Sequence, residues 1–445
     1  MGSFALRLLR LAGFGSVEQA MRHRNFRIYM IGHIPNVVGI WVVRVAIGWL
    51  GWQLTGSAFW LGALAAADTM PALVLGPFGG VLADRRDRRI VAAVAQVAMC
   101  AVATLLAVLT VSGLMTIGIL FALALVRGMT AAFWQPVRLA MTVNLVPRSE
   151  IPAAIALNSS TFHLAQFIGP VLASGLMAAG GPGLAFSFSA LAAGFMLRTL
   201  LIIETPATAP GNRKHGSVLG DIAVGVRYGL THAGIGPILL LLLVLGLGIR
   251  PVTELLPGFA DLVFGLGVGG YSMMVSSVGL GAMVGATWML RQGNRGGITT
   301  IALRSGVVAA VAAVLFALTN WLPLAMFCLA VLGFTMTSCG VAAQQLVQLA
   351  VPDELRGRVM SLFGIIFRAG PGVGALLMGW TADVTGLAWP VGIGAALALA
   401  AFIVANTRRD RLQAALEDAV RASDRVTPGA AAAKTSPRST GRAAE

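Results

Sequence analysis

A few charged side chains lie inside long apolar stretches of this sequence. A charge at the centre of a bilayer costs about 2.5–3.5 kcal/mol on insertion scales, so such groups face the protein interior or a water-filled cavity. There they can carry a proton, pair with one another or bind polar cargo. The candidates for a proton or substrate site are Arg44, Asp68, Arg127, Glu254 and Arg368.

Arg44 and Asp68 lie at the same predicted depth. Counted inward from the turn Thr55–Ser57, each is about ten or eleven residues deep, roughly 15–17 Å at 1.5 Å per residue, which is the middle of the bilayer. Opposite charges at equal depth on sequential helices predict an ion pair that faces the bundle interior. Two interpretations stay open: a structural pair that sets helix packing, or a protonation site at Asp68 whose release from Arg44 changes the packing.

Glu254 follows Arg250 by four residues, so both side chains are predicted on one helix face. Because they approach the outer end of their apolar run, we predict a snorkelling or outer-gate pair rather than a central proton site. Arg127 and Arg368 have no partner nearby in the sequence. Each is interpreted as binding an anionic group of the substrate, as pairing with a distant carboxylate, or as a structural residue. Both favour anionic or carbonyl-rich cargo over a cationic drug.

The composition is that of a membrane protein. The chain of 445 residues is 57% hydrophobic and only 11% charged, whereas soluble domains are about 25% charged. The net charge of +15 does not indicate nucleic acid, because no basic stretch is interleaved with stacking aromatic residues; anionic lipid headgroups are the simpler partner. Cysteine and histidine spacing predicts no disulfide and no metal, and no phosphate-binding loop or other cofactor site is recognised.

Apolar runs of about twenty residues or more, each long enough to cross the hydrocarbon core, predict an all-α membrane protein with twelve transmembrane helices. We place the twelve runs near 27–53, 58–82, 90–111, 114–136, 150–178, 183–203, 235–257, 268–290, 298–318, 322–348, 357–381 and 386–406.

Positive residues occur only in every second connection between these runs. Cytoplasmic loops carry an excess of Lys and Arg, so the pattern places these connections and both chain termini in the cytoplasm of a multi-pass membrane protein; the bacterial inner membrane is what the family resemblance described below implies. The connections that carry them contain Arg85–Arg89, Arg138 with Arg148, Arg213 with Lys214, Arg291 with Arg295, and Arg356 with Arg358.

The chain divides into five regions. Residues 1–26 form a basic cytoplasmic segment that lacks the features of a cleavable signal peptide. A polar linker at 204–233 separates a six-helix bundle at 27–203 from a second at 234–407, and residues 408–445 form a cytoplasmic tail that is partly disordered.

Matched Gly-Pro steps support an internal repeat. Gly169-Pro170 and Gly370-Pro371 occupy corresponding helices of the two predicted bundles. Proline removes an intrahelical hydrogen bond and glycine permits close approach, so we predict helix bending at the bundle interface, with core packing as the alternative. Interrupted helices at corresponding positions of two halves are typical of transporters.

The charged turn Gly80–Arg89 (GVLADRRDRR) carries six charges between two apolar runs and resembles the loop 2–3 signature of the major facilitator superfamily of secondary transporters. Residues 39–57 and 351–361 are similar to the enterobactin-exporter-like branch, although Val43 and Asp68 depart from its usual residues. The resemblance covers about residues 25–407. It implies two pseudo-symmetric six-helix bundles, alternating access, and export of siderophores, drugs or other small metabolites in exchange for protons.

The resemblance also implies a latch on the cytoplasmic side. The Asp of this loop then faces the start of helix eleven, where a carboxylate gains about 0.3–1 kcal/mol from the helix dipole, and neighbouring arginines bridge to acidic partners. Such a latch biases the outward-open state, and a purely topogenic loop is the alternative. The latch residues are Gly80, Asp84, Arg85, Arg88, Arg89 and Arg356.

We therefore predict a transporter, not an enzyme, that works as a monomer and exports a small organic molecule by proton antiport. Uptake or facilitated diffusion of a metabolite is the alternative. An intramembrane enzyme is disfavoured because the membrane-depth charges are spread over many helices rather than clustered at one leaflet. A receptor without transport would not need the matched Gly-Pro helices.

Overall fold

The computed structural model describes residues 15–85, 87–203, 225–229, 231–292 and 297–418. In this part of the chain every regular element is a helix, and eleven helices are long and apolar enough to cross a membrane. The predicted all-α membrane fold is confirmed. Residues 1–14, most of the predicted linker (204–224) and the tail beyond 418 lie outside the described residues.

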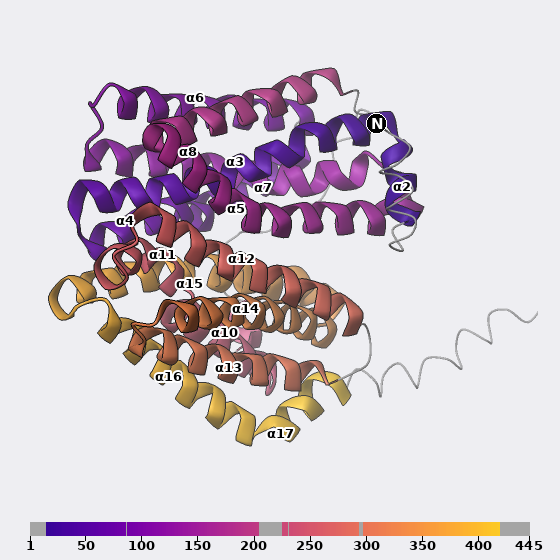
Figure 1. Cartoon of the computed structure of the whole chain (residues 1–445). Helices are drawn as coiled ribbons and strands as arrows, with labels where there is room; N and C mark the ends of the chain where they lie inside the picture. The colour runs from indigo at the N-terminus through magenta and orange to yellow at the C-terminus, as the bar shows by residue number, and fades with distance from the viewer. Residues whose placement is uncertain (1–14, 86, 204–224, 230, 293–296, 419–445) are drawn as a thin grey trace, which may run out of the picture.

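The elements up to residue 202 form the N-terminal half, drawn in indigo to magenta in Figure 1. Within it α3 and α6 pack on α8, and α5 packs on α7. Its elements are α2 (Gly15–Arg22), α3 (Arg24–Thr55), α4 (Ala58–Thr69), α5 (Pro71–Arg85), α6 (Arg88–Val111), α7 (Ile117–Asn144), the short η1 (Arg148–Glu150) and α8 (Ile151–Ile202).

The elements from residue 235 form the C-terminal half, drawn in pink to yellow in Figure 1. Here α12 and α13 pack on α14, and α13 also packs on α16. Its elements are α10 (Ile235–Gly248), α11 (Val252–Gly258), η2 (Phe259–Val263), α12 (Gly267–Gln292), α13 (Ile298–Leu318), α14 (Leu322–Ala350), α15 (Asp353–Thr385), α16 (Ala388–Thr407), α17 (Arg409–Gln413) and η3 (Ala414–Asp418).

The 52 residues of α8 would measure about 78 Å as one straight helix, more than twice the hydrocarbon thickness. The backbone turns inside this element, at Gly180 and Gly181, whose dihedral angles are not helical. Gly181 has φ 69° and ψ −176°, a region that only glycine enters readily. The element therefore joins the two runs predicted at 150–178 and 183–203, while the exact count of twelve crossings stays a prediction.

Two further membrane helices are broken, each next to a proline. The segment predicted at 58–82 is divided between α4 and α5 at Met70, directly before Pro71, and the segment predicted at 235–257 is divided between α10 and α11 around Pro251. After the second break the helical backbone continues through η2 to Val263. The connection predicted at 256–267 therefore begins too early, so Glu254 lies deeper in the membrane segment than the sequence suggested.

Close packing surrounds the two predicted Gly-Pro steps, and bending at them stays a prediction. Both α8 and α15 continue through Pro170 and Pro371 without a break. A Cβ added at Gly169 would lie 2.4 Å from Cβ of Trp41, and Gly370 packs directly on the backbone of Gly246. These glycines allow helices of the same half to touch.

The first and last described elements lie at the same end of the molecule (Figure 1), which we call the termini end. His23, next to α2, contacts Glu150 of η1 with 3.0 Å between Nε2 and Oε2. Glu417 of η3 accepts hydrogen bonds from the backbone nitrogens of Gly297 (2.9 Å) and Thr299 (2.7 Å) at the start of α13. The stretch after Arg408 is thus helical at first, as predicted, and its carboxylate caps a membrane helix.

Candidate functional site

An ion pair joins the two halves at membrane depth. Arg44 of α3 donates to the carboxylate of Glu254 of α11. The prediction that Arg44 pairs with Asp68 is wrong. Glu254 forms its direct ion pair with Arg44, and Arg250 lies within electrostatic range of Glu254, as the four-residue spacing predicted. Equal depth does not fix which way each side chain points around its helix, and Glu254, rather than Asp68, faces Arg44.

Asp68 pairs instead with Arg127, inside the N-terminal half. The distance from Arg127 Nη2 to Asp68 Oδ2 is 2.5 Å. The glycine that follows the arginine makes this contact feasible, because a Cβ at Gly128 would lie 2.6 Å from the carbonyl oxygen of Asp68. Arg127 thus meets a carboxylate of another helix, one of the two roles that the sequence left open for it.

This second pair keeps unused hydrogen-bonding capacity. Asp68 Oδ1 and Arg127 Nε are both buried and have no hydrogen-bond partner in the described part of the chain. Asp68 also lies within electrostatic range of Arg44, so the two ion pairs form one network, to which Arg250, in range of Arg44 and Glu254, adds a further cation. A change in protonation at either carboxylate therefore changes the forces on both arginines.

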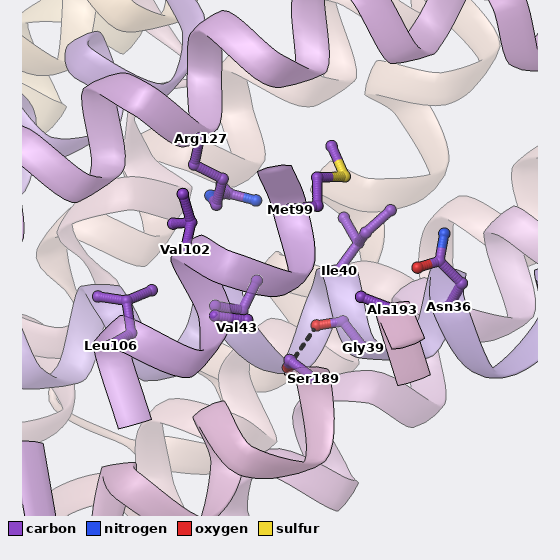
Figure 2. Close-up of a pocket in the computed structure, with 11 residues that line it drawn as sticks. Asn36, Gly39, Ile40, Val43, Met99, Val102, Leu106, Arg127, Ser189 and Ala193 are labelled. Carbon is purple, nitrogen blue, oxygen red and sulfur yellow. Dashed lines mark hydrogen bonds between the residues drawn. The ribbon is translucent and has the colours of Figure 1, made fainter. Parts of the chain in front are cut away.

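A small cavity of about 30 Å³ lies beside Arg127 within the N-terminal half. Figure 2 shows the Arg127 side chain pointing toward the space between Val102 and Met99. Asn36 and Ser189 supply polar groups to the wall, and Ser189 donates to the carbonyl oxygen of Gly39 at 2.9 Å. The volume suits about one water molecule, not an organic cargo.

The remaining predicted arginine, Arg368 of α15, donates to Oε1 of Gln135 of α7. This hydrogen bond crosses from one half to the other, and the Arg368 side chain is exposed. Directly before it in the sequence, the carbonyl oxygen of Phe367 accepts a 2.9 Å hydrogen bond from Arg250 Nη1. Arg250 stands at the break between α10 and α11, with its guanidinium 4.2 Å above the Phe367 ring.

The two halves are joined firmly at the end opposite the termini, which we call the closed end. Asp383, near the end of α15, accepts hydrogen bonds from Ala58 N (2.7 Å), Phe59 N (3.4 Å) and Ser57 Oγ (2.6 Å). These groups form the start of α4 in the other half, where backbone N–H groups lack helical partners. A carboxylate of one half thus caps a helix of the other.

A second contact at the closed end comes from Trp52 of α3, whose Nε1 donates to Asp261 Oδ2 of η2 at 2.9 Å. Between these contacts, glycines let α4 and α15 touch: a Cβ at Gly62 would lie 2.2 Å from the carbonyl oxygen of Ala375, and one at Gly379 would lie 2.3 Å from that of Ala58. The backbones of α4 and α15 are in close contact there, so opening the closed end requires these two helices to separate.

The latch predicted at the termini end is only partly visible. The structure does not describe the surroundings of Gly80 or the side chains of Asp84 and Arg85. The same holds for the side chain of Asp353 at the start of α15. Arg89 donates to the carbonyl oxygens of Leu200 (2.9 Å) and Leu201 (2.5 Å) at the end of α8. It therefore binds a helix terminus of its own half. Arg356 donates to the carbonyl oxygen of Val351 at 3.5 Å, and the latch stays a prediction.

Sequence reasoning missed three residues. Asp261 and Asp383 were assigned to connections, where a carboxylate carries no signal of its own, although Asp383 lies within reach of a helix start once α15 is beside α4. Arg138 was assigned to a connection because its helix was ended at 136, whereas α7 continues to Asn144. Extending the helix through residues 134–144, most of which are apolar, would have found it.

Comparison with known families decides the classification. The family model described as transmembrane secretion effector matches residues 16–440, nearly the whole chain. The chain belongs to this family. It is therefore a transporter of the major facilitator superfamily and not an enzyme, and the predicted membership is confirmed.

Curated relatives of this secretion effector include enterobactin exporters. Those of Shigella boydii and Escherichia coli are 27% identical over 369 residues, which cover 80% of this chain and 85% of the relatives.

Solved transporter structures share the fold. A peptide transporter has a TM-score of 0.72 at 12% identity and covers 88% of this chain and 95% of its own. A bacterial homologue of the lysosomal transporter Spinster, described as inward-facing and unoccupied, has a TM-score of 0.66 at 12% identity and covers 90% and 98%.

Proposed function

We propose that the protein exports a small organic molecule across the bacterial inner membrane by proton antiport, using alternating access. Its similarity to enterobactin exporters over 80% of the chain supports the outward direction. The observation that carries the coupling proposal is the ion pair of Arg44 and Glu254, because it joins the two halves at membrane depth.

The pair explains how exchange avoids leakage. A proton on Glu254 removes the negative charge that holds Arg44. A cargo group that binds Arg44 instead takes the place of Glu254. Either event weakens the contact between the halves. With neither ligand bound the pair stays intact, so the empty, unprotonated carrier is not free to change state, which is what obligatory exchange requires.

Asp68 has a supporting role in this proposal. Its protonation would free Arg127 and, through the shared network, change the field at Arg44. We place the closed end on the periplasmic side, because the arginine-rich connections predicted to be cytoplasmic lie at the termini end. The structure then represents the state that receives cargo from the cytoplasm.

Transport into inside-out membrane vesicles tests the proposal. Radiolabelled chloramphenicol, a neutral molecule, and radiolabelled naphthoate serve as probes, with the interior made acidic. We expect uptake that collapses when the pH gradient is dissipated, and a loss of at least about tenfold in Glu254→Gln. Asp68→Asn should lose part of the gradient dependence. Asp410→Asn is the control, because Asp410 is 89% exposed on α17 and should transport normally.

Facilitated diffusion is the alternative outcome. It requires that flux follow the cargo gradient alone, with the same rate at all imposed pH gradients and in Glu254→Gln. That result would remove the antiport proposal and leave the assignment to the family untouched.

A further inference from the structure

In the described part of the chain, three arginines of the membrane region form hydrogen bonds only to neutral oxygens. Among the described residues, Arg138 donates to Asn158 Oδ1 at 3.3 Å, Arg250 to the carbonyl oxygen of Phe367, and Arg368 to Gln135 Oε1. The other two arginines of the network, Arg44 and Arg127, each have a carboxylate. Arg250 still lies within electrostatic range of Glu254, so Arg138 and Arg368 are the two arginines of this group with no carboxylate nearby among the described residues, and a charge away from water is costly without one.

These three arginines form one connected row across the interface between the halves. Arg250 binds the backbone of Phe367, the residue that precedes Arg368. Arg368 binds Gln135, which lies one helical turn before Arg138 on α7. Arg138 and Arg368 lie within electrostatic range of each other and repel. The repulsion acts between α7 of one half and α15 of the other.

The three arginines have unused hydrogen-bond donors. A guanidinium carries five N–H donors in a planar fork that matches a carboxylate or another oxyanion. Each of the three makes one hydrogen bond to a neutral oxygen here. Two more polar residues, Tyr29 and His33, are fully buried beside Arg138, with Thr142 and Asn158 as their neighbours. The site therefore offers positive charge and hydrogen bonds.

The row lies at the interface between the halves. Arg368 is exposed although it sits near the middle of α15, and its partner Gln135 belongs to the opposite half. An apolar ring adjoins the charges: Phe367 is half-buried, the buried Phe363 ring stacks on it with centroids 5.6 Å apart, and Arg250 lies over its face. An anion with an aromatic body would meet matching chemistry in both parts.

We propose that the cargo is an organic anion whose charged group binds between Arg138 and Arg368, with Arg250 adding positive charge and Phe367 contacting an aromatic body. The inference rests on the proposed export function. An anion bridging Arg138 and Arg368 would replace their repulsion by attraction to a shared ligand. It would draw α7 and α15 together at the termini end of the interface, the movement that closes this end during transport.

Binding to the purified full-length protein in lipid nanodiscs tests the site. Naphthoate, naphthalenesulfonate and naphthyl phosphate are titrated against the neutral naphthamide by calorimetry. We expect at least one anion to bind and naphthamide to bind at least about tenfold more weakly. Arg138→Gln and Arg368→Gln should each weaken the anion about tenfold or more and leave naphthamide unchanged, since one charge-assisted contact is lost.

Arg304→Gln is the matched control. It removes one positive charge from an exposed position of α13, outside the row, and should bind the anion like the unchanged protein. Lys replacements at 138 and 368 keep the charge and should recover part of the affinity, which separates charge from folding. The proposal is overturned if no anion binds, if naphthamide binds equally, or if Arg304→Gln weakens binding as much as the other two.

Outcomes for the site and for export are separable. Gradient-driven vesicle uptake of chloramphenicol without anion binding would sustain export and reject the anionic cargo. Anion binding without gradient-driven uptake of any probe would sustain the site and reject proton-coupled export.

Discussion

At the scale of single residues, one ion pair of membrane-depth charges, Arg44 with Glu254, joins the halves, and a second, Asp68 with Arg127, lies inside the N-terminal half. The Arg44 side chain is 37% exposed and that of Glu254 is 17% exposed. An ion pair in such a setting is weaker than a fully buried one, because water screens it in part. The main effect of the pair is to connect α3 to α11 at one contact, which protonation of Glu254 would release.

A double-mutant cycle measures this pair. Glu254→Gln leaves Arg44 without its anion, and Arg44→Gln leaves Glu254 without its cation, so each single variant should unfold at lower temperature. The double variant removes both charges and should recover part of the loss, with a coupling energy of about 1–3 kcal/mol. Thermal unfolding in nanodiscs gives the four values. Additive losses, with no coupling, would show that the pair does not hold the halves together.

The sequence could predict which residues carry the charges, but not how they pair. Hydropathy places Arg44 and Asp68 at equal depth because depth follows from counting along a helix. Pairing also depends on how each helix is rotated and on which helix is its neighbour, and neither follows from one chain without a fold. Arg127 meets Asp68 because Gly128 lets α7 approach the backbone of α4, and Glu254 meets Arg44 only after the C-terminal half has been placed.

At the scale of elements, helix ends and breaks do most of the positioning. The breaks at Met70 and around Pro251 follow from prolines visible in the sequence, and the turn of α8 follows from two adjacent glycines. The cap on α4 was invisible, because its acceptor, Asp383, is 325 residues away from Ala58. Local signals predict where a helix stops, whereas a distant carboxylate that completes it depends on the fold.

The turn of α8 is expected to depend on glycine at position 181. Its φ of 69° with ψ −176° is strained for any residue with a Cβ, so Gly181→Ala should cost about 1–3 kcal/mol of folding free energy. Gly180→Ala is the matched control: its φ of −159° is extended, and its Cβ would lie 3.1 Å from a terminal carbon of the flexible Leu184 side chain. Thermal unfolding and the yield of folded protein compare them, and equal losses would contradict the assignment of the turn to Gly181.

Asp383 should hold the closed end shut. Asp383→Asn keeps the size of the side chain but removes its charge and half of its acceptors, which costs about 0.5–2 kcal/mol at a helix start. In a variant whose three cysteines, Cys100, Cys328 and Cys339, are replaced, a new cysteine at Ala66 lies against α15. We expect Asp383→Asn to raise its labelling by a membrane-impermeant maleimide from the periplasm by about threefold or more.

Asp410→Asn, exposed on α17, is the control for this labelling and should leave the rate unchanged. Equal labelling of Ala66→Cys with and without the Asp383 substitution would show that the cap does not govern access. Labelling only from the cytoplasmic side would invert the orientation assigned to the closed end.

At the scale of the whole molecule, two halves share one interface whose ends differ. Figure 1 shows α4, α11 and α15 gathered at the end away from the termini, where Asp383 and Asp261 supply the crossing hydrogen bonds. Contacts within each half include those of α3 with α8 and α12 with α14, and α8 and α12 also meet across the interface. Two rigid halves can therefore separate at one end without unpacking either core, which is the geometry that alternating access needs.

Cross-linking tests whether the closed end must open. In the cysteine-free protein, Ser57→Cys with Asp383→Cys places a thiol in each half, at positions whose native side chains meet at 2.6 Å. Joining the two thiols should abolish vesicle transport, and a reducing agent should restore it, because the link prevents the separation of α4 from α15.

The control is Val111→Cys with Gly183→Cys, which joins α6 to α8 inside the N-terminal half, where a Cβ at Gly183 would lie 2.6 Å from Val111 Cγ2. That link should leave transport intact, since each half moves as a unit. Full transport with the closed end cross-linked would mean that cargo does not leave between the halves, and loss of transport with both links would mean that the halves themselves deform.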